Sequence, residues 1–171
     1  MSNPFEEHIG DILSVKTGIV VQGCNAQGKM NSGLAKGLRA MYPGAFDVYA
    51  EEHAKHGLYV GQVVYYKVPL PAGSPVLVIA NAITQKYYGR DKNVVYVDYD
   101  GLERCFVKIG NLAKDLGVPV HFPLIGAGLA NGIWEDIVPR IDRALGPAIE
   151  KHLWRFPDDA TEEQRKNGTL F

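Results

Sequence analysis

The stretch VQGCNAQGKMNSGLAKGL, residues 21–38, decides which fold the sequence predicts. It continues the apolar run IVVQG, which is typical of a buried strand, and it ends with Leu34 and Leu38 at helical spacing. Glycine and asparagine fill the segment between them, so the backbone there is unhindered. The amides of such a turn, together with the first amides of the helix behind it, can face an anion. A binding loop is therefore one interpretation of this stretch, and a tight turn without further function is the other.

The rest of the chain alternates between predicted strands and helices, which favours an α/β domain with a largely parallel, buried sheet. Ligands of such sheets bind at the carboxyl ends of the strands. We expect one domain over residues 1–156 and a polar tail over residues 157–171. The expected strands lie within residues 15–23, 60–68, 76–82, 118–124 and 151–156, and the expected helices within residues 31–41, 45–56, 98–116 and 134–145.

Composition and charge exclude several classes of protein. The 171 residues are 46% apolar and 22% charged, as in an ordinary globular domain. The 18 basic and 19 acidic residues give a net charge of −1 without a basic tract, so we expect no specific nucleic-acid binding. Neither a signal peptide nor an apolar run of membrane-spanning length stands out, so we expect a cytoplasmic protein without a membrane partner. Cys24 and Cys105 lack the C-x-x-C spacing of a metal site, and we expect no metal and no cofactor.

A second glycine-rich stretch, IGAGLANG at residues 125–132, follows the predicted strand within residues 118–124. Neither stretch matches a common phosphate signature. Gly28 and Gly33 have the spacing of GxxxxGK[ST], but the residues after Gly33 are not the required lysine and hydroxyl. The second stretch begins like GxGxxG, but Asn131 stands at its third glycine position. Two such loops on one sheet edge can still hold a diphosphate through backbone N–H groups alone.

Three separated motifs resemble the macro domain family. They are GDI at residues 10–12, VQGCNAQGKMNSGLA at residues 21–35 and FPLIGAGLANGIWEDI at residues 122–137. The resemblance covers residues 8–156 and is closest to the branch of ADP-ribose-1''-phosphate phosphatases and ADP-ribosyl glycohydrolases. That branch shares the pattern C-N-x-x-G-x-x-x-x-G-[IL]-A, which begins here at Cys24. The resemblance implies a three-layer α/β/α sandwich with a mixed, mostly parallel central sheet.

The resemblance also implies which residues bind the ligand. Asp11 would accept a hydrogen bond from the adenine amino group beside the Ile12 amide, Phe156 would stack on adenine, and Asn25 would bind the distal ribose. The residues themselves leave alternatives open: Asp11 and Asn25 also suit turns, and Phe156 also suits a core. The residues implied to hold the two phosphates are Asn31, Ser32, Gly33, Leu34, Ile125, Gly126, Ala127, Gly128 and Leu129.

The sequence departs from the family at the positions that carry catalysis. Gln85 occupies the position at which the family has a lysine, and the nearest lysine, Lys86, follows one residue later. Ala130 occupies the position at which the family has an acidic residue. A covalent lysine adduct with the sugar is therefore not expected. In the phosphatase pattern a histidine stands two residues before the Cys-Asn pair, and here that residue is Gln22.

The remaining catalytic candidates are Asn25, Gln22, Arg90 and Asp91. Arg90 would clamp a terminal phosphate and Asp91 would position a water, although both also suit an ordinary exposed loop. Cys24 and His121 are expected to be structural.

These observations predict an ADP-ribose-binding hydrolase that converts ADP-ribose-1''-phosphate to ADP-ribose and phosphate. Three alternatives stay open. The chain could remove ADP-ribose from a macromolecule or an O-acyl ester, it could be a non-catalytic reader of ADP-ribose, or it could bind another nucleotide. The expected partners are ADP-ribose or a derivative and, for the first alternative, an ADP-ribosylated macromolecule.

Overall fold

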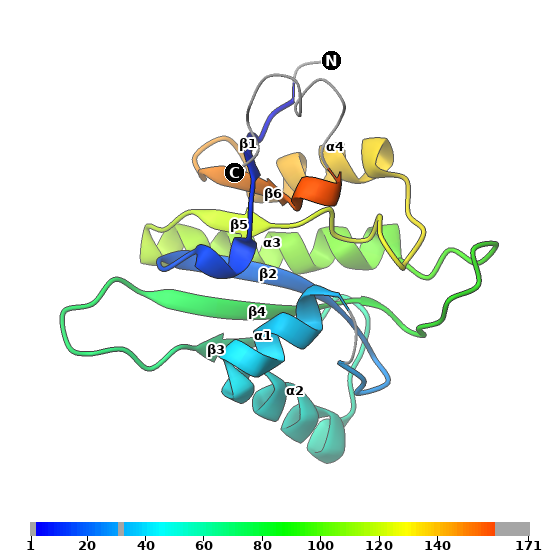
Figure 1. Cartoon of the computed structure of the whole chain (residues 1–171), viewed down its shortest axis with the longest axis horizontal. Helices are drawn as coiled ribbons and strands as arrows, with labels where there is room; N and C mark the ends of the chain where they lie inside the picture. The colour runs from blue at the N-terminus through cyan, green and yellow to red at the C-terminus, as the bar shows by residue number, and fades with distance from the viewer. Residues whose placement is uncertain (1–2, 31–32, 160–171) are drawn as a thin grey trace.

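A six-stranded sheet forms the middle layer of the protein, as a computed structural model of the chain shows (Figure 1). The structure describes residues 3–30 and 33–159. The strand order is β1-β6-β5-β2-β4-β3, and every neighbouring pair is parallel except β3 with β4. The predicted mixed, mostly parallel sheet is therefore confirmed. The strands are β1 (Glu6–Ile9), β2 (Gly18–Asn25), β3 (Val63–Lys67), β4 (Leu77–Gln85), β5 (Val120–Phe122) and β6 (Lys151–Arg155).

Helices cover both faces of the sheet, which confirms the predicted three layers (Figure 1). Helices α1 (Leu34–Met41) and α2 (Pro43–His56) cover one face over β2, β4 and β3, and α3 (Tyr99–Leu116) and α4 (Trp134–Leu145) cover the other. Two short 3-10 turns, η1 (Ile12–Ser14) and η2 (Pro157–Asp159), complete the described elements. Within residues 3–30 and 33–159, none of the helices combines the length and the apolar character that crossing a bilayer requires.

Three elements differ in length, start or presence from the sequence predictions: β5, α2 and β1. Strand β5 is only three residues long because Pro119 and Pro123 flank it, and a proline cannot donate to a ladder. Helix α2 begins at Pro43, two residues before the expected start at residue 45, because a proline is well tolerated in the first turn of a helix. Strand β1 was not predicted, since only the last of its four residues is buried.

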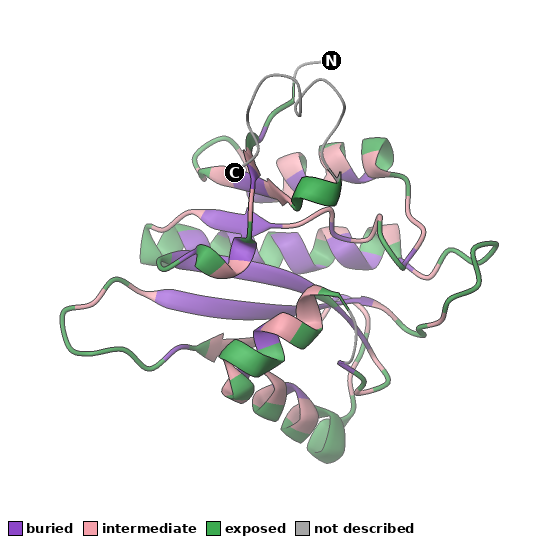
Figure 2. Cartoon of the chain, in the orientation of Figure 1, coloured by how far each residue is buried: buried purple, intermediate pink, exposed green. Residues whose placement is uncertain are grey.

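The core is divided by the sheet into two sides, and the central strands β2 and β4 are buried almost throughout (Figure 2). On the side of α3 and α4, three phenylalanines pack edge to face: the Phe122 ring lies 5.0 Å from the Phe5 ring and 5.6 Å from the Phe106 ring. Helix α3 packs an apolar stripe into this core, which includes the fully buried Leu102, Phe106 and Ile109. Its ends are capped by the Asp98 carboxylate, which accepts from the Gly101 amide, and by Gly117 in the left-handed region.

We predict that Phe122→Ala lowers the free energy of unfolding by about 3–5 kcal/mol, because it removes a fully buried ring and leaves a cavity between Phe5 and Phe106. Urea denaturation followed by circular dichroism measures the change. Phe156→Ala is the matched control, since that side chain is 40% exposed and its loss should change stability by no more than about 0.5 kcal/mol. Equal losses for the two variants would contradict this account of the core.

Candidate functional site

Five parallel strands end at the same edge of the sheet, and the polar segments of the sequence follow those ends. We name the segments that leave β2, β4 and β5 the first glycine loop (residues 26–33), the tyrosine loop (residues 86–98) and the second glycine loop (residues 123–133). Asp11 and Phe156 follow β1 and β6 at the same edge, because Ile9 pairs with Arg155. This edge is where open parallel sheets bind their ligands.

Asn25 organises the first glycine loop. Its Oδ1 accepts from the Gln27 amide at 3.0 Å and from the Lys29 amide at 3.3 Å, and its Nδ2 donates to the Lys29 carbonyl at 2.8 Å. The hydroxyl of Tyr49 in α2 donates to the Asn25 carbonyl at 2.6 Å. The side chain of Asn25 is thus the turn-forming residue of the alternative interpretation. Its side-chain amide is engaged within the loop, and its contact with the distal ribose stays a prediction.

The conformation of this loop requires glycine at position 28. Gly28 has φ of 77°, and an added Cβ would lie 2.6 Å from His53 Nδ1 in α2. Gly33 also has a positive φ, of 59°, and precedes α1 without a side-chain cap. Asn31 and Ser32, two of the expected phosphate ligands, lie outside the described residues.

Gln22 does not take the expected position beside a substrate. The side chain is 1% exposed and points into the layer between the sheet and α2, where its Nε2 donates to Asn81 Oδ1 at 2.6 Å. Asn81 in turn donates to the Ala45 carbonyl at 3.0 Å, which fixes the orientation of the pair. The prediction that Gln22 contacts a substrate is therefore wrong: this is a core residue with a buried hydrogen bond.

The second glycine loop turns tightly and leaves amides free. The Gly132 amide donates to the Gly126 carbonyl at 2.8 Å, and the Asn131 amide donates to the Gly128 carbonyl at 3.1 Å. Gly126 has φ of 81°, and helix α4 begins directly after the loop. The amides of Gly128 and Leu129 make no hydrogen bond to any residue within the described ranges, and both residues are exposed. Such amides are available to an anion.

The tyrosine loop is joined to both glycine loops. Gln27 Nε2 donates to the Lys86 carbonyl at 3.1 Å, which links it to the first glycine loop. Asn131 Nδ2 donates to the carbonyls of Asp91 and Val94 at 3.0 and 2.7 Å, which links it to the second. Hydrogen bonds therefore connect the three loops along this edge of the sheet. In the sequence Asn131 stands where the GxGxxG pattern has a glycine, and in the structure its φ of 61° lies in the left-handed region that asparagine tolerates.

The tyrosine loop presents the remaining catalytic candidates to solvent. Tyr87 and Tyr88 are more than half exposed, and Arg90 and Asp91 are exposed beside them. Asp91 Oδ1 accepts from the Asn93 amide at 2.9 Å, so the loop carries its own turn. A hollow of about 550 Å³ lies on the outer side of this loop, and no described residue of the two glycine loops lines it. Its lining consists of Val60, Lys86, Tyr87, Val94, Val95, Tyr96, Val97, Asp98, Tyr99, Asp100 and Arg140.

Asp11 and Phe156 occupy the far end of the same edge. Asp11 is exposed and caps η1, since one carboxylate oxygen accepts from the Leu13 amide at 2.9 Å. Its other oxygen makes no hydrogen bond to a residue in the described part of the chain. Ile12 is buried beneath it, and Phe156 is 40% exposed, so its ring is not part of the core. The structure thus brings Asp11 and Phe156 to one end of the edge, although Asp11 also forms a turn.

The departures from the family's catalytic pattern are visible in the contacts. Gln85 Nε2 donates to the Tyr87 carbonyl at 2.7 Å, and the Lys86 ammonium lies over the Tyr87 ring at 5.2 Å. Ala130 is buried. Neither the position of Gln85 nor that of Ala130 offers an ionisable group.

Cys24 and His121 are structural, as predicted. His121 Nδ1 accepts from Trp154 Nε1 at 2.9 Å, and burial together with the neighbouring His152 lowers the pKa of His121 to about 4, so its imidazole is neutral. Burial also raises the pKa of the Cys24 thiol well above its ordinary value. A neutral, buried thiol is a poor nucleophile, so nucleophilic chemistry at Cys24 is not supported.

Comparison with known proteins gives the same fold. No protein-family model matches the sequence. The chain is 24% identical over 148 residues to a DNA ADP-ribosyl glycohydrolase from Thermus aquaticus, and the match covers 86% of this chain but 39% of that protein. This chain therefore spans less than half the length of that curated relative.

Solved structures resemble the chain over most of its length. The macrodomain of Mycobacterium tuberculosis DarG has a TM-score of 0.72 at 20% identity, covering 88% of this chain and 97% of that one. Thermosipho africanus DarTG in complex with ADP-ribose has a TM-score of 0.70 at 19% identity, covering 91% of this chain and 42% of that one. At these identities the likeness establishes the fold alone, and the chain has the macrodomain fold.

We predict that Asn25→Ala lowers the free energy of unfolding by about 2–4 kcal/mol, because it leaves the amides of Gln27 and Lys29 without their acceptor. The first glycine loop should also become a preferred site of limited proteolysis. Asn93→Ala, at an exposed position in the tyrosine loop, is the control and should change stability by no more than about 0.5 kcal/mol. If the two variants unfold at the same urea concentration, the first glycine loop does not depend on the Asn25 amide.

Proposed function

We propose that the chain binds ADP-ribose across the carboxyl ends of its parallel strands and hydrolyses a derivative of it. The observation that carries the proposal is the pair of amides of the exposed residues Gly128 and Leu129, which bond no residue within the described ranges and lie at the edge where the macrodomain fold brings its loops together. Further support comes from a structural neighbour solved with ADP-ribose and from a relative that is a DNA ADP-ribosyl glycohydrolase.

The strand order provides a linear arrangement for an extended ligand. The adenine would lie beside Asp11 and Phe156, next to β1 and β6, with the free carboxylate oxygen of Asp11 accepting from the amino group and Ile12 offering its amide. Four steps between strands separate β1 from β4 in this sheet, a span of about 19 Å, which leaves room for an extended dinucleotide-sized ligand. The distal ribose would then lie near Asn25, where the first glycine loop and the tyrosine loop meet.

The two phosphates would lie in the middle of this span, between the ends of β5 and β2. The second glycine loop, from Ile125 to Leu129, would offer the amides of Gly128 and Leu129 from one side, since those of Ile125 and Ala127 already bond within the loop. The amides of Gly33 and Leu34, at the start of α1, would offer the positive end of the helix dipole from the other. No cationic side chain is needed, because backbone donors on both sides neutralise the diphosphate.

The substrate that these groups favour is ADP-ribose-1''-phosphate. Arg90 would hold the terminal phosphate through its planar pair of N–H donors. Asp91 would accept a proton from a water that attacks phosphorus, the bond from phosphorus to the sugar oxygen would break, and that proton would pass to the sugar oxygen. The products would be ADP-ribose and phosphate. Hydrolysis of an O-acyl-ADP-ribose would use the same water, and a non-catalytic reader would use only the binding edge.

A second candidate substrate is ADP-ribose attached to a nucleic acid. The exposed side chains of the tyrosine loop combine the basic residues Lys86, Arg90 and Lys92 with the aromatic rings of Tyr87 and Tyr88. Aromatic rings interleaved with cations are the means by which proteins hold single strands. The net charge alone predicted no specific nucleic-acid binding, and this local basic and aromatic surface favours a nucleic-acid substrate instead. The relative from Thermus aquaticus, a DNA ADP-ribosyl glycohydrolase, supports the same class of substrate.

Gly128→Glu should weaken ADP-ribose binding by about 10- to 100-fold, because a carboxylate beside the proposed diphosphate position repels it. Gly128 accepts a side chain, since nothing lies within 4 Å of an added Cβ. Gly128→Gln is the neutral control of the same size and should retain most of the affinity. Calorimetric titration with ADP-ribose, ADP, NAD and ATP measures the effect and the selectivity. Equal affinities for the two variants, or no heat with the unaltered chain, would refute the proposed binding mode.

Asp91→Asn should slow phosphate release from ADP-ribose-1''-phosphate by about 10²- to 10⁴-fold, because an amide keeps the hydrogen bond to the Asn93 backbone but cannot take a proton from water. Lys92→Gln is the control and should leave this rate unchanged. A parallel assay follows release of ADP-ribose from a modified oligonucleotide. Turnover of the oligonucleotide alone would select the second candidate, and binding without turnover of either substrate would select a reader.

A further inference from the structure

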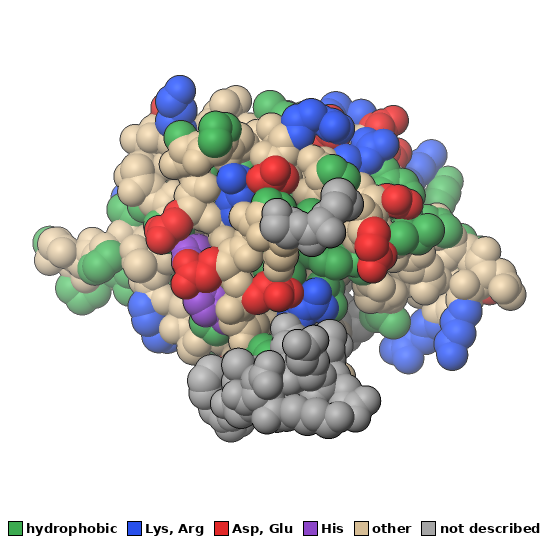
Figure 3. Space-filling model, turned by 90° about the horizontal axis from the view of Figure 1, so that it is seen from above, with side chains coloured by type: hydrophobic (Ala, Val, Ile, Leu, Met, Phe, Trp, Pro, Cys, Tyr) green, Lys and Arg blue, Asp and Glu red, His purple; other side chains and the backbone are tan. Residues whose placement is uncertain are grey.

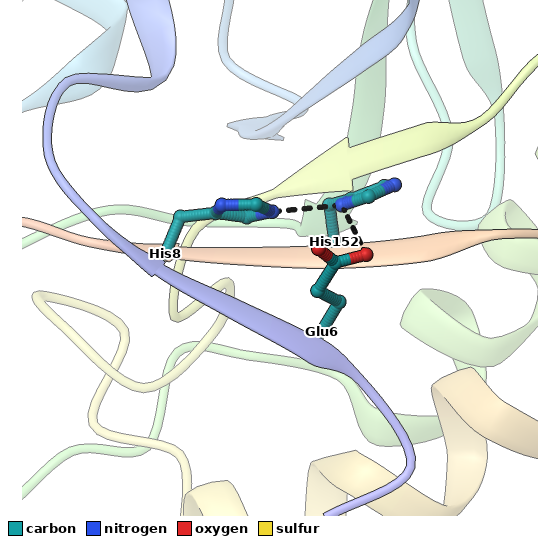
Figure 4. Close-up of side chains that lie close together, drawn as sticks. All are labelled: Glu6, His8 and His152. Atoms are coloured by element: carbon teal, nitrogen blue, oxygen red, sulfur yellow. Dashed lines mark hydrogen bonds and ion pairs between the residues drawn. The ribbon is translucent and has the colours of Figure 1, made fainter.

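Three possible metal ligands converge on one face of the sheet, away from the edge where the strands end. Glu6 and His8 project from β1, and His152 projects toward them from the neighbouring strand β6 (Figure 4). One ligand atom from each residue lies within 4.8 Å of the other two. In the space-filling view, histidine atoms reach the surface between acidic side chains (Figure 3).

The strand register produces this convergence. Glu6 pairs with His152 across the parallel β1–β6 ladder, and His152 pairs with His121 of β5. Since side chains alternate along a strand, Glu6 and His8 share one face, while Glu7 lies on the other and bonds Arg155. His152 is more than 140 positions from His8 in the chain, so only the pairing of β1 with β6 brings it to Glu6 and His8.

The separations suit a small divalent ion after a minor adjustment. His8 Nε2 lies 2.8 Å from His152 Nδ1, and Glu6 Oε2 lies 3.4 Å from the same Nδ1. Two ligands of a tetrahedral zinc ion, each at about 2.0–2.1 Å from it, lie about 3.3 Å apart. A small rotation of the His8 ring away from His152 therefore opens the space that an ion needs.

The surrounding contacts hold the two rings in place. Glu150 Oε1 lies 3.8 Å from His152 Nε2, and when Nε2 carries the proton, the Nδ1 lone pair faces His8 Nε2. His121 stacks on His152 with ring centroids 4.6 Å apart. His8 stacks on Trp154 at 4.4 Å, and Trp154 in turn donates to His121.

We propose that Glu6, His8 and His152 bind one divalent transition-metal ion of the zinc class. Two imidazole nitrogens and one carboxylate oxygen are a ligand set that zinc takes, with a water in the fourth position. Without metal, a single proton shared between His8 Nε2 and His152 Nδ1 occupies the same place. The ion would fasten the short first strand to β6 and so stabilise the edge of the sheet next to Asp11. This proposal does not depend on the proposed function.

The test uses the full chain, freed of metal by chelation and dialysis and then titrated with zinc. We expect one zinc ion per chain, a rise in the melting temperature on adding zinc, and visible d–d absorption of a low-coordinate site when cobalt replaces zinc. His8→Gln and His152→Gln should each abolish all three signals. Glu6→Gln changes a carboxylate that is 61% exposed, so it should leave the fold intact and weaken zinc binding by about tenfold or more.

The exposed pair His53 and His56 on α2 provides the control. His53→Gln and His56→Gln should leave zinc binding and the cobalt spectrum unchanged. Zinc binding that survives in all three ligand variants, that is lost in the control variants, or that is absent from the unaltered chain would overturn the proposal. Titration with ADP-ribose in the presence and absence of zinc distinguishes the proposed metal site from the proposed ADP-ribose site. His152→Gln should retain its affinity for ADP-ribose.

Discussion

The parallel pairing of β2 with both β5 and β4 is the constraint on which the rest of the structure depends. Parallel neighbours must be joined by crossovers that return over a face of the sheet, so helices are required on both sides and the central strands become buried. The same geometry sends every parallel strand out of the sheet at one edge. The glycine loops, the tyrosine loop, Asp11 and Phe156 meet there because their strands run in one direction.

Long, strongly patterned elements could be predicted from the sequence, and contacts between distant segments could not. Strand β4 and helix α3 were predicted because an apolar run and a helical stripe are local signals. Strand β1 was missed because EEHI is mostly polar, and its partner β6 lies at the other end of the chain. The burial of Gln22 depends on Asn81, a residue 59 positions away, and so could not be read from the run IVVQG.

Ligand binding by backbone amides and catalysis by side chains depend on different features of a sequence. The sequence therefore supports a prediction of binding more firmly than a prediction of catalysis. Backbone amides can hold a diphosphate if the loop has a suitable conformation. Such a conformation often requires glycine, as at Gly28 and Gly126, so it can be recognised in the sequence. Proton transfer needs a particular side chain at a particular position. Gln85 and Ala130 place no ionisable group where the resembled family carries its catalytic side chains, whereas the glycines of both loops are present.

The two faces of the sheet differ in a way that bears on both proposed sites. The face against α3 and α4 contacts an apolar core that includes Ile19, Val21 and Phe122. Polar side chains gather on the opposite face: Gln22 and Asn81 lie beneath α2, and His121 and His152 lie beside β1. A buried polar group costs stability unless it is bonded. Gln22 Nε2 donates to Asn81 and His121 accepts from Trp154, while Gln22 Oε1 has no hydrogen-bond partner among the described residues. The opposite face packs apolar residues as well, Val20, Leu38 and Ile79 among them, and the proposed metal ligands lie at its β1 edge.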